Sequence, residues 1–342
     1  MTRLLQAMAG APHGGAEAFF ERLAPALAKA GVEQRVLIRD NPKRAELLRS
    51  KGVDLTELPF GGALDLVTRW KLAQEIKRFR PEVVLSWMNR ASKFVPKGDY
   101  VRVGRLGGYY DLKYYRGCDH LIGNTQDIRD WIVGQGWPAE RAHYVPNFVA
   151  EPGLAQPLAR ASQDTPEGAP LIVAMGRLHP NKGFDVLLHA LEKLHDAYLW
   201  IAGEGPLRTE LSELAAHLSV RPRMRFLGWR DDVAALYAAA DIFVCPSRHE
   251  PLGNVVIEAW AAAKPVVACA SQGPRQLIRD GVDGLLVPVD DADALAAAIR
   301  RLMAEPDTAR ALAAAGRQAY EERFTQAAVV ARYLEFFDTV KR

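Results

Sequence analysis

The chain has 342 residues, of which 49% are hydrophobic and 25% charged, and its net charge is only +3. These fractions are typical of a folded globular protein and exclude a disordered or collagen-like chain. At this length we expect two domains. No apolar run approaches the roughly 20 residues that span a bilayer. The apolar stretch before Gln6 is too short for a signal peptide, so we expect a cytoplasmic protein.

Short runs rich in β-branched residues alternate with longer helical patterns, as in parallel sheets covered by helices on both faces. In the first half, the predicted strands are 4–8, 35–38, 83–86, 101–103 and 121–122. In the second half, they are 171–174, 199–202, 225–227, 242–245, 266–269 and 285–287.

The segment 151–170 lies between these two sets of strands. It holds four prolines and few large apolar residues, which favours a linker. We therefore expect two Rossmann-like, doubly wound α/β domains, residues 1–150 and 171–325, facing each other across a ligand-binding cleft. The helical pattern of 326–342 needs an apolar surface to cover, and we expect it to join the first domain.

Each half opens with a strand, a glycine-containing turn and a helix. The first turn holds Gly14 and Gly15, where the absence of side chains lets backbone N–H groups approach a phosphate. The second turn holds Arg177 and Lys182, which lie five residues apart around Pro180 and can converge on one anion. Two such cations can neutralise a leaving diphosphate without a metal.

The most informative stretch, 247–260, follows the predicted strand 242–245. Asn254 is predicted to cap a helix over 255–263, so that Glu250 lies in the preceding loop and Glu258 about one turn inside the helix. A helix N-terminus opened by Gly253 offers free N–H groups to an anion such as a diphosphate. Beside that anion, we expect the two carboxylates to bind hydroxyl groups.

Charge is divided unevenly between the halves. Residues 1–150 contain 23 Lys and Arg against 16 Asp and Glu, a net +7, and the remainder carries −4. Aromatic residues are interspersed among the basic residues of the first half, which include Lys77, Arg78, Arg80, Arg90, Lys93, Lys97, Arg102 and Arg105. This pattern is typical of a surface that binds anionic lipid or a charged acceptor. The alternative is an ordinary solvent-exposed surface. No nucleic-acid-binding motif accompanies it, so we expect no nucleic-acid partner.

Together, these motifs resemble family 4 of the retaining glycosyltransferases, which have the GT-B fold. The resemblance is densest over 171–290 and thinner over 1–150. It rests on the order and spacing of Gly14-Gly15, Gly176-Arg177, Lys182-Gly183, Gly203-Glu204-Gly205-Pro206, and Glu250 and Glu258, and it continues through 264–268 and 281–287.

The resemblance implies an enzyme that moves a sugar from a nucleotide-diphosphate sugar to an acceptor hydroxyl, with retention and an α-linkage. It implies that Arg177 and Lys182 bind the donor diphosphate, that Glu258 binds the ribose, and that Glu250 is the catalytic carboxylate at the donor sugar. The other implied donor-binding residues lie on loops or at the helix start: Gly14, Gly15, Gly203, Glu204, Gly253, Asn254 and Val255.

The acceptor side departs from the family pattern, which often has a histidine after a strand of the first domain. The loops 87–90 and 105–111 contain none, which leaves Asn89 and Asp111 as alternatives; His13, in the glycine turn, is a third candidate for donor or acceptor contact. We expect a lipopolysaccharide-type glycan or glycolipid acceptor, with peripheral contact at the inner face of the membrane. The donor sugar, its base and the oligomeric state stay open.

We expect no metal and no other cofactor. Asp291-Ala292-Asp293 matches a metal-holding Asp-x-Asp pattern, but it opens the predicted helix 294–303, so capping explains it. Cys118, Cys245 and Cys269 match no zinc or disulfide spacing. Two alternative functions remain: a nucleotide-sugar epimerase of GT-B fold, and a non-catalytic nucleotide-sugar-binding protein.

Overall fold

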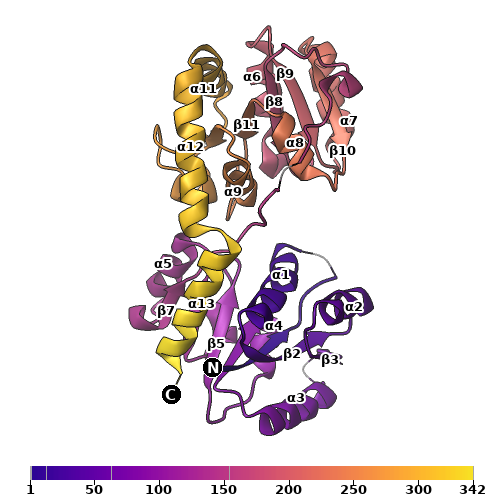
Figure 1. The fold of residues 1–342 in the computed structure, drawn as a ribbon. Coiled ribbons are helices and arrows are strands. Elements are labelled where there is room, and N and C mark those ends of the chain that lie inside the picture. Colours follow the sequence, from indigo (N-terminus) through magenta and orange to yellow (C-terminus); the bar gives the residue numbers. More distant parts are fainter. Residues whose placement is uncertain (1, 13, 63, 154, 342) are drawn as a thin grey trace. The chain divides into compact units, whose positions relative to one another are not determined.

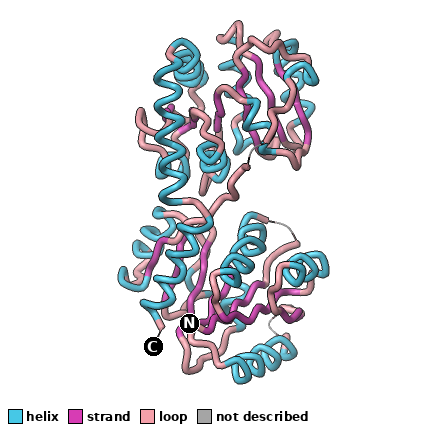
Figure 2. The backbone as a smooth tube through the Cα atoms, in the orientation of Figure 1, coloured by secondary structure: helices cyan, strands magenta, loops and turns pink. Residues whose placement is uncertain are grey.

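The computed structural model describes residues 2–12, 14–62, 64–153 and 155–341. The chain forms two compact units. Unit 1 comprises Met1–Phe148 and Gln326–Arg342, and unit 2 comprises Val149–Thr325. In both, helices flank a sheet of parallel strands (Figures 1 and 2).

Unit 1 contains a seven-stranded parallel sheet in the order β3-β2-β1-β4-β5-β6-β7. Its strands are β1 (Arg3–Met8), β2 (Glu33–Arg39), β3 (Leu55–Leu58), β4 (Val83–Trp87), β5 (Val101–Leu106), β6 (His120–Gly123) and β7 (Ala142–Tyr144). Its α-helices are α1 (Gly15–Lys29), α2 (Pro42–Ser50), α3 (Leu66–Phe79), α4 (Met88–Phe94), α5 (Gln126–Gly134) and α13 (Gln326–Val340). Two 3-10 turns, η1 (Leu112–Tyr114) and η2 (Ala139–Arg141), complete it.

Both faces of this sheet are buried, which explains why its strands are near-continuous apolar runs. Leu4 packs with α1, α2 and α13 on one face, and the next residue, Leu5, packs with α3 and α4 on the other. Neither leucine is exposed to solvent. Helix α5 covers the strands at the far edge through Ile128 and Ile132.

Unit 2 contains a six-stranded parallel sheet in the order β10-β9-β8-β11-β12-β13. Its strands are β8 (Leu171–Met175), β9 (Tyr198–Ala202), β10 (Met224–Gly228), β11 (Ile242–Cys245), β12 (Val266–Cys269) and β13 (Leu285–Val287). Its α-helices are α6 (Phe184–Glu192), α7 (Arg208–His217), α8 (Val233–Ala239), α9 (Asn254–Ala261), α10 (Gln272–Leu277), α11 (Ala292–Ala304) and α12 (Pro306–Arg323). Its 3-10 turns are η3 (Arg160–Gln163), η4 (Pro180–Lys182) and η5 (Arg221–Arg223).

The predicted fold class, two Rossmann-like α/β domains, is confirmed, and each predicted strand overlaps a strand of the structure. The structure adds β3 and β7, which the sequence did not reveal. They have only four and three residues, and each contains charged or polar side chains, so neither forms an apolar run. In both sheets, strand order reverses beside the first strand of the unit, at β1/β4 and β8/β11. Ligands of open α/β sheets bind at such switch points.

Helix α13 packs on unit 1 through a buried polar contact as well as apolar side chains. Arg105 on β5 is 1% exposed, and its Nε donates a hydrogen bond to Tyr333 Oη on α13 over 2.8 Å. Its guanidinium also lies 4.6 Å from the Trp87 ring centroid. Arg105 was predicted to belong to a basic surface; that interpretation is wrong, because this arginine is buried in the core.

The segment 151–170, expected as a linker, packs in part on unit 2. Arg160 donates hydrogen bonds to Ala239 O and to the carboxylate of Asp241. Thr165 is buried and accepts a hydrogen bond from Trp200 Nε1 over 2.9 Å. These contacts tie the segment to unit 2. Within the described residues, no helix is both long and apolar enough to cross a bilayer.

Candidate functional site

Four loops of unit 2 converge at the carboxyl ends of its central strands, at the β8/β11 switch point. They follow β8, β9, β11 and β12, and backbone hydrogen bonds join them. His249 N donates to Asn181 O over 3.1 Å, Leu178 N to Glu204 O over 2.9 Å, and Gly273 N to Glu250 O over 2.7 Å. The candidate donor-binding loops of unit 2 and the loop after β12 therefore form one connected surface.

Two glycines permit backbone approaches that a side chain would block. Gly203 has φ +135°, and a Cβ built there would lie 1.9 Å from Gly176 O. Gly183 has φ +62°, and its Cβ would lie 2.2 Å from Pro246 O. At both positions the backbone φ is positive and the main chain of another loop leaves no room for a Cβ. Glycine is therefore required for the loops to approach each other this closely.

Lys182 and Glu250 come from two of these loops and form an ion pair between Nζ and Oε2. The other carboxylate oxygen of Glu250 accepts a 3.4 Å hydrogen bond from Gly253 N–H. Arg177 lies on the same loop as Lys182 but is exposed, and it has no ion-pair partner among the described residues. The site thus combines one paired and one free cation.

Helix α9 begins at Asn254, one residue earlier than predicted. Gly253 occupies the N-cap position with φ +82°, and no side chain caps the helix. The predicted capping role of Asn254 is therefore wrong, because the left-handed turn at Gly253 starts the helix. Asn254 Oδ1 is buried and has no hydrogen-bond partner within the described part of the chain. Val256 N and Ile257 N donate to Gly253 O, which leaves the N–H groups of Asn254 and Val255, at the very start of the helix, available to an anion.

Glu258 lies one turn inside α9 and is fixed by a tyrosine on α8. Tyr237 Oη donates a hydrogen bond to Glu258 Oε2 over 3.1 Å and lies at the same distance from Val255 O. Burial, together with the nearby Glu258 carboxylate, raises the pKa of Tyr237 well above its usual value of 10. The phenol therefore stays protonated and remains a donor that orients this carboxylate.

Several residues that shape the site were not predicted from the sequence. Arg248 donates hydrogen bonds to Asp185 and to Pro180 O, which holds the loop after β11 against η4. Hydrogen bonding to Asp185 raises the pKa of Arg248 above its usual value. Ser271 Oγ and Gln272 Oε1, in the loop after β12, are buried without hydrogen-bond partners among the described residues. The signal in the sequence that could have identified these two residues is their position directly after a predicted strand.

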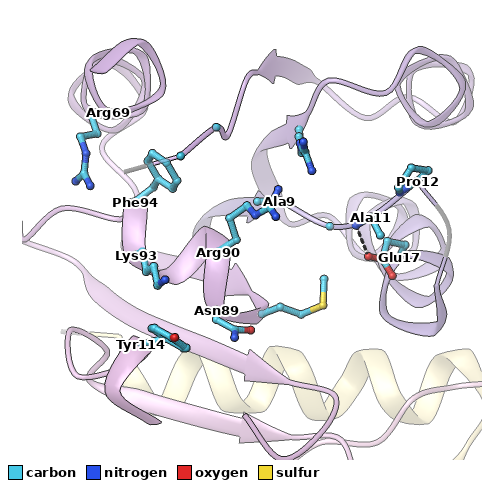
Figure 3. A pocket seen from close by; sticks show the side chains of 15 residues that line it. Ala9, Ala11, Pro12, Glu17, Arg69, Asn89, Arg90, Lys93, Phe94 and Tyr114 are labelled. Atoms are coloured by element: carbon cyan, nitrogen blue, oxygen red, sulfur yellow. Dashed lines mark hydrogen bonds between the residues drawn. The ribbon is translucent and has the colours of Figure 1, made fainter. Parts of the chain in front are cut away.

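In unit 1, the glycine turn wraps around a buried carboxylate. Glu17 on α1 accepts a 2.7 Å hydrogen bond from Ala11 N–H, drawn in Figure 3. A Cβ on Gly14 would lie 2.3 Å from Glu17 Oε2, whereas one on Gly15 would meet nothing within 4 Å. The candidate His13 lies outside the described residues. The turn is thus shaped by Glu17, which the sequence analysis did not single out.

The two remaining acceptor candidates have different surroundings. Asn89 is on α4 and lines a cavity of unit 1 (Figure 3). Asp111 is not among the residues that line this cavity; it accepts a hydrogen bond from Lys113 N over 2.9 Å and pairs with the Lys113 side chain. Hydrogen bonding to Lys113 lowers the pKa of Asp111. Of these two candidates, Asn89 therefore lines the cavity and Asp111 does not.

The Asp-x-Asp pattern has structural partners. Asp291 accepts a 2.8 Å hydrogen bond from Ala294 N and caps α11, as predicted. Asp293 pairs with Lys193. Within the described residues, no group of three or more His, Cys, Asp or Glu side chains is arranged to hold a metal ion.

Comparison with known proteins identifies the class of protein. Residues 155–319 match the family model of group 1 glycosyl transferases, and residues 13–151 match that of glycosyltransferase family 4. The chain is 38% identical over 328 residues to the lipopolysaccharide core biosynthesis glycosyltransferase LpsE of Rhizobium meliloti (strain 1021), covering 94% of this chain and 95% of LpsE. The chain belongs to the group 1 glycosyltransferases and is a glycosyltransferase.

Solved structures show the same GT-B fold. A glycosyltransferase from Rickettsia africae ESF-5 superposes with a TM-score of 0.88 at 20% identity, covering 99% of this chain and 98% of that one. Anabaena Alr3699/HepE in complex with UDP superposes with a TM-score of 0.85 at 20% identity, covering 99% and 100%.

Proposed function

We propose that this glycosyltransferase is a retaining, metal-independent enzyme. In this proposal, it transfers a sugar from a nucleotide-diphosphate sugar to a hydroxyl of a lipopolysaccharide-type acceptor and forms an α-linkage. The observation that carries the proposal is the convergence of Lys182, Glu250 and the uncapped N-terminus of α9 at the switch point of unit 2.

The donor is assigned to unit 2 because its groups match the parts of a nucleotide-diphosphate sugar. The α9 N-terminus, Lys182 and the free Arg177 supply positive potential for a diphosphate. Glu258, oriented by Tyr237, is a hydrogen-bond acceptor for the ribose hydroxyls. Glu250 accepts hydrogen bonds from the hydroxyls of the donor sugar. Gly203 and Glu204 lie on the loop assigned to the base.

In the proposed reaction, the bond from the anomeric carbon to the diphosphate breaks and a bond to the acceptor oxygen forms on the same face. The departing phosphate oxygen takes the acceptor proton. Lys182, Arg177 and the α9 N–H groups stabilise the charge that develops on the diphosphate, so no metal is required. Because both bonds lie on one face, an α-linked donor yields an α-linked product.

The acceptor assignment rests on the similarity to LpsE and on the positive charge of residues 1–150. LpsE is named for lipopolysaccharide core biosynthesis, and its sequence aligns with nearly all of this chain. Residues 1–150 carry the excess of positive charge. We assign the acceptor to unit 1, whose cavity lies at the carboxyl ends of its strands.

A donor screen followed by two substitutions tests the proposal. Thermal shifts with UDP-, GDP-, ADP- and CMP-sugars identify the donor, because a bound ligand raises the unfolding temperature. Glu250→Ala should reduce transfer roughly 10²-fold or more but retain or improve nucleoside-diphosphate affinity, since Lys182 loses its competing partner. Lys182→Ala should weaken that affinity, because Glu250 is left unpaired beside the diphosphate. Glu192→Ala, on an exposed position of α6, is the control.

Several outcomes would contradict this assignment. If Glu250→Ala and Lys182→Ala weaken nucleoside-diphosphate binding equally, their separate roles are wrong. A β-linked product formed from an α-linked donor, identified by NMR, would exclude retention, and loss of transfer in EDTA with recovery on adding a divalent ion would exclude metal independence. Conversion of the donor without any acceptor would indicate an epimerase, and binding without turnover would indicate a sensor.

We also propose that unit 1 contacts the membrane through residues 64–70. Leu64 is 92% exposed, Leu66 72% and Trp70 61%, at or just before the start of α3. This helix also carries Arg69, Lys71, Lys77 and Arg78. Exposed apolar residues beside basic ones bind the interface of an anionic bilayer.

Co-sedimentation with vesicles tests this contact. Leu66→Ser/Trp70→Ser should reduce binding to phosphatidylglycerol vesicles at least tenfold, whereas Trp229→Ser, at a 74% exposed tryptophan of unit 2, should not. Equal binding to phosphatidylcholine vesicles, or no effect of the double substitution, would refute the membrane contact.

A further inference from the structure

The cavity of unit 1 lies where four parallel strands end. It has a volume of about 930 Å³. Its lining includes Ala9 and Gly10 after β1, Arg39 at the end of β2, and Asn89 after β4. It therefore occupies the β1/β4 switch point, where open α/β sheets bind their ligands. Its volume lies near the upper end of the range for small-molecule sites, so more than one sugar ring fits.

Four cationic side chains line this cavity: Arg39, Arg69, Arg90 and Lys93. They come from β2, α3 and α4. None of the four has an ion-pair partner in the part of the chain that the structure describes, although many surface arginines of this chain are paired with carboxylates. Like charges gathered without counter-charges repel one another, so an anionic ligand would relieve that repulsion.

Among the described residues of the lining, Glu17 is the one carboxylate, and it leaves most of this positive charge unbalanced. Glu17 is only 5% exposed, and its Oε1 accepts the hydrogen bond from Ala11 N–H. A Cβ on Gly10 would lie 2.4 Å from Glu17 Oε1, which shows how closely the turn encloses this side chain. Glu17 thus holds the glycine turn, and the net charge of the lining is strongly positive.

Two of the cations lie against aromatic rings, which also form apolar parts of the cavity wall. Arg69 Cζ lies 5.2 Å from the Phe94 ring centroid, and Lys93 Nζ lies 3.9 Å from that of Tyr114. Figure 3 shows Arg90, Lys93 and Asn89 projecting from α4, with Tyr114 near Lys93. Cation–π contacts restrict these side chains but leave their N–H groups free to bind an anion. Apolar walls with a few placed polar groups are typical of sites for organic ligands.

We infer that this cavity binds the acceptor through an anionic substituent, a phosphate or carboxylate on one of its sugars. This inference rests on the proposed transferase function and deepens it. The four cations bind the charged group, Asn89 hydrogen-bonds a sugar hydroxyl, and Phe94 and Tyr114 contact the sugar ring. A neutral glycan of the same size would leave the cations unpaired and bind more weakly.

Calorimetric titration of the donor-free protein tests the inference, with glucose 6-phosphate, glucuronate and glucose as probes. The wild-type protein should bind one of the anionic probes at least tenfold more tightly than glucose, and added salt should reduce the difference. A preference for glucose 6-phosphate identifies phosphate, and one for glucuronate identifies carboxylate. No preference in the wild-type protein overturns the inference before any variant is made.

Two double variants locate the preference. Arg69→Gln/Arg90→Gln removes two cavity cations and should abolish the preference, whereas Lys77→Gln/Arg78→Gln removes the same charge from α3 outside the cavity and should keep it. A preference that survives the first variant, or falls equally in both, overturns the inference. Thermal unfolding verifies that both variants fold.

Nucleotide-sugar binding is measured in parallel to separate the two proposals. Failure to bind any nucleotide sugar counts against the proposed function. Intact nucleotide-sugar binding without an anionic preference counts against this inference alone. A preference for the anionic probe that depends on Arg69 and Arg90 supports the anionic site in either case.

Discussion

The close approach of Gly183 to Pro246 joins the two loops that carry Lys182 and Glu250. Gly183 has φ +62°, and a Cβ there would lie 2.2 Å from Pro246 O. Gly183→Ala therefore imposes two penalties, a strained left-handed backbone and an overlap with main chain. Because a carbonyl oxygen cannot rotate away as a flexible side chain can, we expect the loops to move apart.

A second glycine separates these two penalties. Gly281 has φ +72°, but its Cβ would meet nothing within 4 Å. Gly281→Ala should therefore cost only the left-handed strain, about 1–2 kcal/mol. Gly183→Ala should cost that strain plus about 1–3 kcal/mol for the overlap. For a domain the size of unit 2, each 1 kcal/mol lowers the unfolding temperature by roughly 2–4 °C.

Unfolding and donor titration of both variants measure the two effects. Gly183→Ala should be the less stable variant and should bind the nucleoside diphosphate at least tenfold more weakly, because Lys182 is displaced from the α9 N-terminus. Gly281→Ala should retain wild-type affinity. Equal loss of stability in the two variants, or wild-type affinity in Gly183→Ala, would refute the view that this contact holds the donor loops together.

Three further predictions concern packing, pH and capping. Tyr333→Phe removes the acceptor of buried Arg105 Nε and should cost about 1–3 kcal/mol in chemical unfolding; an unchanged midpoint would contradict this role for the contact. Burial lowers the pKa of His143 to about 4, and that of His120 is also lowered. Because the unfolded chain binds more protons below pH 6.5, stability should fall from pH 6.5 towards 4, and His143→Phe should flatten that fall in urea midpoints. Asp291→Ala should cost about 1 kcal/mol and leave transfer unaffected by EDTA; unchanged stability would contradict the capping role, and a chelator-sensitive wild-type enzyme would contradict metal independence.

The convergence of the candidate loops of unit 2 could be predicted because their signals are local. Arg177, Lys182 and Gly183 follow one strand, and Glu250, Gly253 and Glu258 follow another, within short stretches of chain. Carboxyl ends of parallel strands meet at one edge of a sheet, so these residues had to lie near each other. The partner of Glu258 was not predictable, because Tyr237 belongs to another helix and meets it only through packing.

The basic character of unit 1 could be predicted only in outline. The excess of basic residues in the first half was visible, but Arg105 and Lys93 looked alike in the sequence. The fold buries Arg105 against Tyr333 and leaves Lys93 in a cavity. Counting charges in the sequence does not distinguish a buried arginine from a lysine that lines a cavity, because burial depends on which helix covers each strand.

The sequence by itself determined the fold class and indicated the candidate loops of unit 2, because apolar periodicity and short motifs act over a few residues. Only the tertiary structure decided that Lys182 pairs with Glu250, 68 residues away, and that Arg39, Arg69 and Arg90 line one cavity. Such contacts depend on strand order and on helix packing. Both are set by long-range burial of side chains that no local pattern specifies.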